Sequence, residues 1–296
     1  MPKNRYLVTI GTFDGVHRGH QKLLSWVIAR AKKLKLKTRV VFFVAPPRFF
    51  FKPEMTVPTL TASKDRRKFI RSLGIDRVEM LRFGPRWAAM PHTRFFADYI
   101  IGRWKAGGLL VGRDFAFGKG RKGGPDYLKA ACAQHGLHLG ILPLMRVDGR
   151  KISSSGIRGL LLKGHVKDAA KLLGRDYAVT GRVVRGQGLG RKIDVPTANL
   201  NLSRELLVPA GVFAVRVHGR ALKRAMRAVC NVGFRPTLNG RLKHPKVEVH
   251  IPGWTGSLYG RRLTVEFLRR LRPERKFPSL EALRRAIQRD IAAAKA

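Results

Sequence analysis

The 296-residue sequence is poor in acidic residues and in cysteine. Asp and Glu number 18 against 61 Lys and Arg, so the formal net charge is +43. Its two cysteines, Cys132 and Cys230, lie 98 residues apart and fit neither a zinc spacing nor a disulfide framework. A reducing compartment suits such a chain, and we expect a cytoplasmic protein.

Long apolar stretches are also lacking. The segment MPKNRYLVTIG has no long apolar run and no small-residue cleavage site, so we expect no signal peptide. The most apolar segment, residues 40–51, is interrupted by Pro46, Pro47 and Arg48 and is too short to cross a bilayer. We therefore expect a soluble protein without a membrane span.

The basic excess is spread along the chain. Residues 1–174 carry a net charge of +25 and residues 175–296 carry +18, which is nearly the same density. A dedicated nucleic-acid module usually concentrates its charge on one face or in a tail, and no RRM, KH, zinc or helix-turn-helix signature is present. A general compositional bias is the favoured interpretation. The alternative is a protein that makes non-specific contacts with nucleic acid or other polyanions.

The first half of the chain alternates strand-like and helix-like segments. This alternation predicts an α/β domain of Rossmann-like type, with a parallel sheet covered by helices on both faces. Ligands of such sheets bind at the carboxyl ends of the strands. We expect strands at 5–11, 38–44, 77–83, 109–112 and 137–144, and helices at 20–35, 62–74, 93–104 and 125–136.

The second half is all-β in style. Short strands separated by glycine and proline turns predict a small closed antiparallel barrel. Ser279 offers an N-cap for a terminal helix. We place the domain boundary between residues 1–174 and 175–296. The expected strands are 176–184, 211–219, 227–233, 246–251 and 262–271, and the apolar face of the helix holds Leu280, Leu283, Ala286, Ile287 and Ile291.

The decapeptide GTFDGVHRGH, residues 11–20, follows a strand and opens a helix. Gly11 and Gly15 allow tight turns, and the helix N-terminus offers free N–H groups to phosphate. His17 and His20 can donate hydrogen bonds that stabilise the charge of a transferring nucleotidyl group. The alternative is a turn with two surface histidines.

The pattern resembles the nucleotide-binding signature of the nucleotidylyltransferase superfamily, and its longer form looks like the FAD synthetase branch. This resemblance implies that the first domain adenylylates FMN to FAD with ATP. It implies catalytic roles for His17 and His20. It also implies ATP contacts for Gly11, Phe13, Asp14, Gly15 and Gly19.

Two further segments support the resemblance. GRDFAFGKGRKGG, residues 112–124, is similar to the family's flavin and nucleotide loop. ISSSGIR, residues 152–158, resembles its Ser-Ser-Thr-x-Ile-Arg motif, with the hydroxyl kept at residue 155. The residues implied are Asp114, Phe115, Phe117 and Gly118 for the loop, and Ser153, Ser154, Ser155 and Arg158 for ATP.

One departure from the family concerns residues 43–48. The family usually carries Phe-Glu-Pro-His-Pro-Arg there, whereas this chain reads FVAPPR. The histidine that is missing lies near ATP in the family. A riboflavin kinase with impaired or lost adenylylation is therefore an alternative.

A second glycine-rich segment, residues 181–200, ends in the tetrapeptide PTAN. Its alternate glycines, Gly186, Gly188 and Gly190, can hold phosphates through backbone N–H groups. It is not a P-loop, because Gly-x-x-x-x-Gly-Lys-Ser/Thr is absent from the chain. A hydroxyl and an amide two residues apart supply oxygen ligands that suit Mg²⁺ beside ATP.

This segment looks like the riboflavin kinase signature, which implies phosphorylation of riboflavin to FMN. The resemblance implies Mg²⁺ ligation by Thr197 and Asn199, a general-base role for Glu248 in KVEVHI, and a flavin end at Arg272 and Phe277. The resemblance also implies ATP contacts for Gly186, Gly188, Gly190 and Arg191. The alternative for Arg272 is a surface ion pair with Glu274.

A departure also precedes this tetrapeptide. The family usually has glycine and a large apolar residue there, and this chain has Asp194 and Val195. The carboxylate could repel ATP or join the metal environment. Residues 5–295 as a whole resemble bacterial bifunctional riboflavin kinase/FAD synthetases, whose small-molecule partners are ATP, riboflavin, FMN and FAD.

Overall fold

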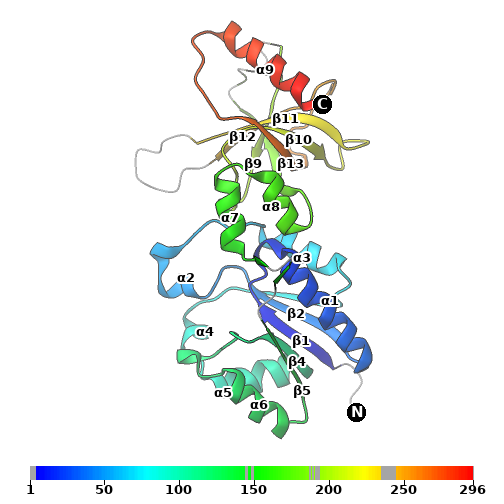
Figure 1. Ribbon diagram of the computed structural model, residues 1–296, viewed down its shortest axis with the longest axis vertical. Helices are drawn as coiled ribbons and strands as arrows, with labels where there is room; N and C mark the ends of the chain where they lie inside the picture. The colour runs from blue at the N-terminus through cyan, green and yellow to red at the C-terminus, as the bar shows by residue number, and fades with distance from the viewer. Residues whose placement is uncertain are drawn as a thin grey trace. The chain divides into compact units, whose positions relative to one another are not determined.

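The computed structural model describes residues 5–143, 146–147, 150–186, 188, 190, 194–234 and 245–295. The chain divides into two compact units, residues 1–153 and 154–296 (Figure 1). Each unit has its own sheet and its own hydrophobic core, and each is described separately.

The N-terminal unit is built on a five-stranded sheet in the order β3-β2-β1-β4-β5, and every pairing is parallel. The predicted Rossmann-like domain is confirmed. The order reverses between β1 and β4, which is where open α/β sheets bind their ligands. The strands are β1 (Tyr6–Gly11), β2 (Lys37–Phe43), β3 (Arg77–Leu81), β4 (Ala106–Gly112) and β5 (His138–Leu142).

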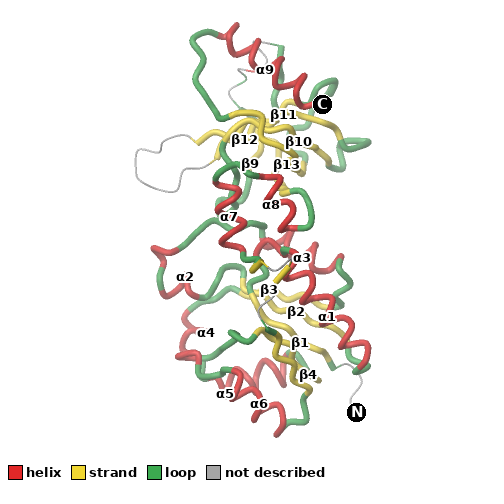
Figure 2. Tube along the Cα trace, viewed as in Figure 1, coloured by secondary structure: helices red, strands yellow, loops and turns green. Residues whose placement is uncertain are grey.

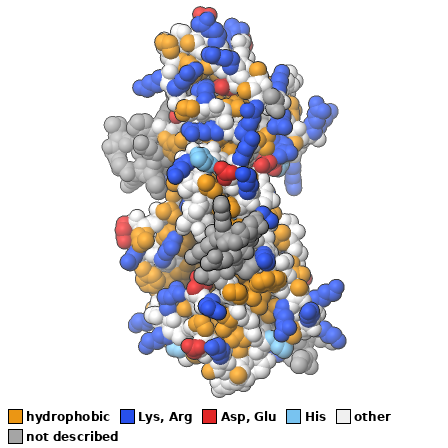
Figure 3. Space-filling view, viewed as in Figure 1, with side chains coloured by type: hydrophobic (Ala, Val, Ile, Leu, Met, Phe, Trp, Pro, Cys, Tyr) orange, Lys and Arg blue, Asp and Glu red, His pale blue; other side chains and the backbone are white. Residues whose placement is uncertain are grey.

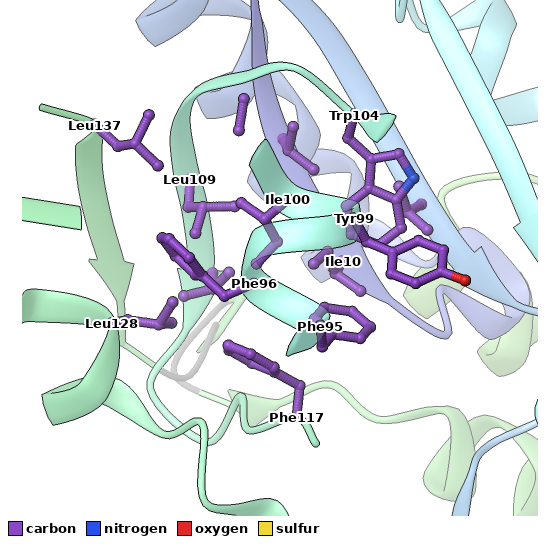
Figure 4. Close-up of a cluster of buried hydrophobic side chains, with 14 of the residues drawn as sticks. Ile10, Phe95, Phe96, Tyr99, Ile100, Trp104, Leu109, Phe117, Leu128 and Leu137 are labelled. Carbon is purple, nitrogen blue, oxygen red and sulfur yellow. The ribbon is translucent and has the colours of Figure 1, made fainter. Parts of the chain in front are cut away.

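Helices cover both faces of this sheet because side chains alternate along β1. Leu7 packs against α1 (Arg18–Lys33), whereas Val8 and Ile10 face a larger cluster rich in aromatic rings (Figure 4). The helix α3 (Ser63–Ser72) shares the α1 face, where Ile70 meets Leu24. The other elements are α2 (Arg48–Phe51), α4 (Pro85–Ala89), α5 (His92–Phe95), α6 (Pro125–Gln134), η1 (Asp14–Val16), η2 (Pro53–Met55), η4 (Lys119–Arg121) and the small hairpin β6 (Arg146–Val147) and β7 (Arg150–Lys151).

The helix expected at 93–104 differs from a regular α-helix. Its first turn is α5, and the remainder, η3 (Phe96–Arg103), is a π-helix. The wider spiral accompanies dense aromatic packing around Trp104, whose indole is fully buried against Phe95 and Tyr99.

The C-terminal unit is a closed barrel of six strands in the order β10-β11-β12-β9-β8-β13 (yellow in Figure 2). All pairings are antiparallel, so the predicted barrel is confirmed. Its strands are β8 (Tyr177–Val184), β9 (Ala198–Asn201), β10 (Gly211–His218), β11 (Met226–Phe234), β12 (Pro245–His250) and β13 (Arg262–Arg272). The strand β9 was not expected from the sequence.

The terminal helix α9 (Leu280–Lys295) packs on the outside of the barrel. Ser279 caps it as predicted, because its Oγ accepts a hydrogen bond from Ala282 N at 3.1 Å. Ile291 packs against the barrel, but Leu280 is 54% exposed and does not belong to the buried face.

Two further helices, α7 (Ser154–Leu162) and α8 (Val166–Leu173), belong to the C-terminal unit. They pack on each other, and α8 also contacts β8 and β13. The boundary predicted after residue 174 assigns these two helices to the first domain. That domain boundary stays a prediction. The compact units divide 21 residues earlier, between residues 153 and 154.

Basic side chains are scattered over the face seen in Figure 3 and do not gather in one stripe. Their distribution agrees with the even charge density of the sequence. Among the described residues, no helix combines the length and apolar character needed to cross a membrane.

Candidate active sites

The first candidate site lies at the carboxyl ends of β1 and β4. Residues 11–20 leave β1, and residues 112–124 leave β4, its neighbour in the sheet. Two motifs that are about 100 residues apart in the chain therefore start side by side, at the point where the strand order reverses.

The turn after β1 has an unusual backbone. Phe13 and Val16 have φ angles of 49° and 40°, and Gly15 has 79°. The Phe13 ring folds back over Gly11, where an added Cβ would lie 3.0 Å from the ring. Glycine at residue 11 therefore permits the close approach, and α1 can begin at Arg18 directly after the turn.

The imidazoles of His17 and His20 are brought together by this turn. Their rings stack with centroids 3.7 Å apart, and the Phe13 ring meets His20 edge-on at 5.2 Å. His17 is the N-cap of α1, and its Nδ1 accepts the backbone N–H of His20 at 3.4 Å. A neutral His17 therefore carries its proton on Nε2.

The surroundings of His20 favour its neutral form. Burial lowers the pKa of this imidazole well below 6.5, and the positive charges of His17 and Arg66 lower it further. Its Nδ1 is buried and has no hydrogen-bond partner among the described residues. A buried polar atom without a partner is uncommon in native proteins.

Beneath the turn lies an ion pair that sequence reasoning missed. Asp14 is 2% exposed, and its carboxylate accepts a hydrogen bond from Arg66 Nη2 at 3.2 Å. Arg66 stands in the basic run KDRRK, which in the sequence looks like a solvated helix face. No sequence signal separates it from Arg67, which is exposed.

The loop that follows β4 combines packing with exposed polar groups. Phe117 is 7% exposed and stacks near Phe95 in the core (Figure 4). Gly118 leaves no room for a Cβ beside His92. These two residues shape the loop. The contacts with flavin and nucleotide stay predictions for all four loop residues, Asp114, Phe115, Phe117 and Gly118.

The serine motif straddles the division between the units. Ser153 ends the first unit, while Ser154, Ser155 and Arg158 open α7 in the second. Arg158 is 7% exposed. The predicted contacts of this motif with ATP at residues 11–20 stay predictions.

Residues 43–48, which differ from the usual sequence of the family, connect β2 to α2. Pro47 precedes α2, and Val44 is held by a hydrogen bond from its N–H to Leu81 O at 2.9 Å. The exposed rings of Phe50 and Phe51 follow, and both meet Phe83.

The second candidate site lies on the outer face of the barrel. In β12, Val247 and Val249 are 1% exposed and point into the barrel, so Glu248 between them points outward. Its direct neighbours across the strands are Asn199 in β9 and Asn231 in β11. Asn231 was not predicted, because nothing in CNVGFRPT marks it as different from a solvent-facing strand residue.

The same row continues across the barrel from Asn231 to Val212 in β10 and from Val212 to Arg272 in β13. A pocket of about 270 Å³ is lined by four residues of this row, Glu248, Asn231, Val212 and Arg272, whereas Asn199 is not part of its lining. Its lining joins the predicted residues Gly190, Thr197, Glu248, Arg272 and Phe277 with Asn231, Lys246 and Asp290.

The glycine turn packs directly on the PTAN tetrapeptide. A Cβ at Gly186 would collide with the Asn199 amide, and one at Gly190 would collide with Val195 O and approach Thr197 Oγ1 at 3.4 Å. Arg191 lies outside the described residues. Gly188 has a φ of 74° and open space around it.

Two ion pairs involve carboxylates that the sequence analysis singled out, Glu248 in the pocket and Asp194 before the PTAN tetrapeptide. Lys246 Nζ lies 2.8 Å from Glu248 Oε1. Asp194 is exposed and reaches toward Arg284 of α9, with 3.9 Å between Nη2 and Oδ2. The predicted effect of the Asp194 carboxylate on ATP or on the metal stays a prediction.

The flavin end predicted at Arg272 is organised by α9. Arg272 forms a forked ion pair with Asp290, with Nη2–Oδ2 at 2.8 Å and Nε–Oδ1 at 3.1 Å. Its guanidinium also lies over the Phe277 ring at 5.3 Å. A surface pair with Glu274 is not formed, because the Glu274 carboxylate lies against Gly233.

The donor set fits a magnesium ion bound with ATP. The described residues contain no cluster of three or more His, Cys, Asp or Glu side chains suited to a metal. Thr197 and Asn199 instead offer a hydroxyl and an amide oxygen near the Glu248 carboxylate. Mg²⁺ typically binds with few protein oxygens and completes its shell with phosphates and water.

Comparisons with known proteins assign a family to each part of the chain. The FAD synthetase family model matches residues 2–156, and the riboflavin kinase family model matches residues 173–296. A bifunctional riboflavin kinase/FMN adenylyltransferase of Pseudomonas fluorescens is 39% identical over 296 residues, covering 100% of this chain and 94% of that protein. The protein of the same description from Escherichia coli (strain K12) is 35% identical over 289 residues, covering 98% of this chain and 91% of that protein.

A solved structure resembles the whole chain. The crystal structure described as a macrolide-efflux protein from Streptococcus pneumoniae has a TM-score of 0.85 and 29% identity, covering 100% of this chain and 95% of that one.

A parallel sheet with a histidine turn and a barrel with a glycine–PTAN site together define a two-domain flavin-nucleotide transferase. The end-to-end relatives make the assignment specific. The chain belongs to the family of bifunctional riboflavin kinase/FMN adenylyltransferases. Neither family match concerns nucleic-acid binding, so that interpretation of the charge has no support.

Proposed function

We infer that the chain phosphorylates riboflavin to FMN with one ATP and adenylylates FMN to FAD with a second ATP. The observation that carries this inference is the presence of both sites in one chain that matches its relatives from end to end. The residue roles below, the magnesium requirement and the cytoplasmic location are proposals.

In the barrel, we assign the general base to Glu248. The terminal ribityl hydroxyl of riboflavin attacks the γ-phosphorus of ATP, its proton passes to the Glu248 carboxylate, and ADP leaves. Lys246 orients that carboxylate through their ion pair at 2.8 Å. Thr197 and Asn199 would hold the Mg²⁺, which neutralises phosphate charge when bound.

At the flavin end of this pocket, Arg272 and Phe277 form the wall. The ion pair with Asp290 fixes the guanidinium, which in turn lies over the aromatic ring. A planar flavin can lie beside this stacked pair.

In the N-terminal unit, adenylyl transfer needs no nucleophile from the protein. A phosphate oxygen of FMN attacks the α-phosphorus of ATP, a new P–O–P bond forms, and pyrophosphate leaves with the electron pair of the broken bond. His17 Nε2–H and the His20 imidazole donate to phosphate oxygens as charge develops on them. The positive end of the α1 helix dipole adds to this stabilisation.

The purified chain tests the inference directly. With riboflavin, ATP and Mg²⁺, chromatography should show FMN and then FAD, and with FMN as the starting flavin it should show FAD. FMN formation without any FAD would instead support the alternative of a riboflavin kinase that does not adenylylate FMN. The altered sequence at residues 44–46 is the observation that favours this alternative. No reaction with either flavin would refute the inference.

A further inference from the structure

Arg66 is almost completely buried in the N-terminal unit. It stands in the first turn of α3 and is 1% exposed. Its Nη1 donates to Thr12 O at 2.7 Å and also approaches Phe43 O at 3.3 Å and Val44 O at 3.4 Å. One guanidinium thus bridges the carboxyl ends of two neighbouring strands, β1 and β2.

The other nitrogen of Arg66 holds the turn from below. Nη2 donates to Asp14 Oδ1 at 3.2 Å and to Thr61 O at 3.0 Å. The Asp14 carboxylate also accepts the backbone N–H groups of Leu60 at 3.0 Å and Thr61 at 3.3 Å. A buried ion pair needs further hydrogen bonds, and both Arg66 and Asp14 make several beyond their own contact.

The atoms that Arg66 contacts flank one of the two non-glycine residues of the turn that have a positive φ. Thr12 and Asp14 stand on either side of Phe13, whose φ is 49°. Left-handed backbone in a non-glycine residue persists only where its surroundings enforce it. The same turn decides where His17 caps α1 and where His20 stacks upon it.

We propose that Arg66, through Asp14 and Thr12, is the positioning residue that fixes His17 and His20 for adenylyl transfer. The proposal rests on the proposed role of the two histidines. It assigns Asp14 to anchoring the turn, whereas the sequence predicted a contact with ATP. A second effect supports it, because the charge of Arg66 contributes to the lowered pKa of His20 and so favours a neutral hydrogen-bond donor.

The test uses three variants of the full-length chain. Arg66→Met removes both the charge and the donors, and Arg66→Lys keeps the charge but loses the fork. Arg39→Met is the matched control, since it removes an arginine of the same unit whose partner is Glu79, away from the turn. Steady-state kcat and KM are measured for FMN adenylylation, and riboflavin phosphorylation by the same preparation reports on intact protein.

We expect Arg66→Met to lower the adenylylation kcat about 100-fold, because small displacements of groups at a reacting centre have effects of this size. The KM values for ATP and FMN should change little, and riboflavin phosphorylation should be unchanged. Arg66→Lys should restore part of the lost kcat, and Arg39→Met should retain it.

A double-mutant cycle separates positioning from a merely structural role. If Arg66 acts through the imidazoles, Arg66→Lys should have little further effect on kcat in a His20→Asn background. Fully additive losses, an increase in KM alone, or a normal kcat in Arg66→Lys with lowered thermal stability would each overturn the proposal. If Arg66→Met does not fold, Arg66→Lys and the cycle still decide. Failure of the histidine assignment itself is distinguishable, because His17→Asn and His20→Asn would then retain activity.

Discussion

At the scale of single residues, His17 combines two roles in one ring. Its Nδ1 caps α1 by accepting the His20 backbone N–H, and its Nε2 is the proposed donor to phosphate. The stacked contact with His20 also means that protonation of either ring disfavours protonation of the other.

His17→Asn should separate these roles. Asparagine is a good N-cap, so α1 should keep its stability, but the donor at Nε2 is lost. We expect the kcat of FMN adenylylation to fall about 10²–10³-fold, as for loss of one donor to a developing oxyanion. FAD formation is followed by chromatography, and riboflavin phosphorylation serves as the control. Retained FAD formation would remove His17 from the catalytic assignment.

The lowered pKa of His20 predicts acid sensitivity of the N-terminal unit. Below pH 6.5 the unfolded chain takes up a proton at His20 that the folded chain does not, so stability falls as the pH falls. The contribution is at most about 1.4 kcal/mol per pH unit. Hydrogen exchange of the β1 amides between about pH 5 and pH 7 measures it. His20→Gln should flatten this dependence, and an unchanged slope would contradict the assignment.

At the scale of elements, the kinase site depends on how closely the glycine turn packs on β9. Gly186 has no room for a side chain because the Asn199 amide lies against it. This contact packs Asn199, the predicted metal ligand, against the glycine turn that is predicted to bind phosphate.

Gly186→Ala should therefore disturb the ATP site of the kinase. Overpacking costs about 1–3 kcal/mol, so we expect kcat/KM for ATP in riboflavin phosphorylation to fall about tenfold or more. FMN adenylylation by the same variant is the internal control. Normal kinase activity would show that Asn199 is not held by this contact.

The helix α9 is predicted to act on riboflavin through Asp290. Asp290→Asn leaves the Arg272 guanidinium without its ionic partner, which should cost about 1–3 kcal/mol of stability and raise the KM for riboflavin. Arg284→Gln on the same helix is the control, since its exposed pair with Asp194 at 3.9 Å should contribute little. Steady-state kinetics and thermal unfolding give the two measurements. Equal effects of both variants would contradict a specific role for Asp290.

At the scale of the whole molecule, the two reactions are assigned to separate compact units. Each unit has its own core and holds a candidate site, although the serine motif predicted for ATP in adenylylation runs from Ser153 into α7 of the second unit. The product of the barrel reaction, FMN, is the substrate of the other.

Complementation between two inactive variants tests this separation. Glu248→Gln should stop at riboflavin, with the kinase kcat lowered about 10²–10⁴-fold, and His17→Asn should stop at FMN. A mixture of the two should form FAD from riboflavin, because free FMN can pass from one chain to the other. Chromatography of the flavins measures the outcome. A mixture that accumulates FMN without FAD would show that transfer occurs only within one chain.

Much of the architecture was predictable because its elements are periodic. The strand–helix alternation before residue 144 gave the parallel sheet, and the glycine-punctuated strands gave the barrel. The strand β9 was missed because its sequence, ANLN, is short and polar. It becomes a strand through its pairing with β8 and β12, which its own residues do not indicate. The π-helix was missed because its pattern does not differ from that of an α-helix over so few residues.

The sequence by itself determined the fold class, the family resemblance and the candidate motifs, because these depend on local propensity and on residues close together in the chain. Only the tertiary structure decided that Arg66 is buried beneath Asp14, that Asn231 stands beside Glu248, and that Arg272 pairs with Asp290. Each of these relations joins residues between 17 and 52 positions apart. Such pairs are chosen by packing and by the burial of charge, and no short-range pattern encodes them.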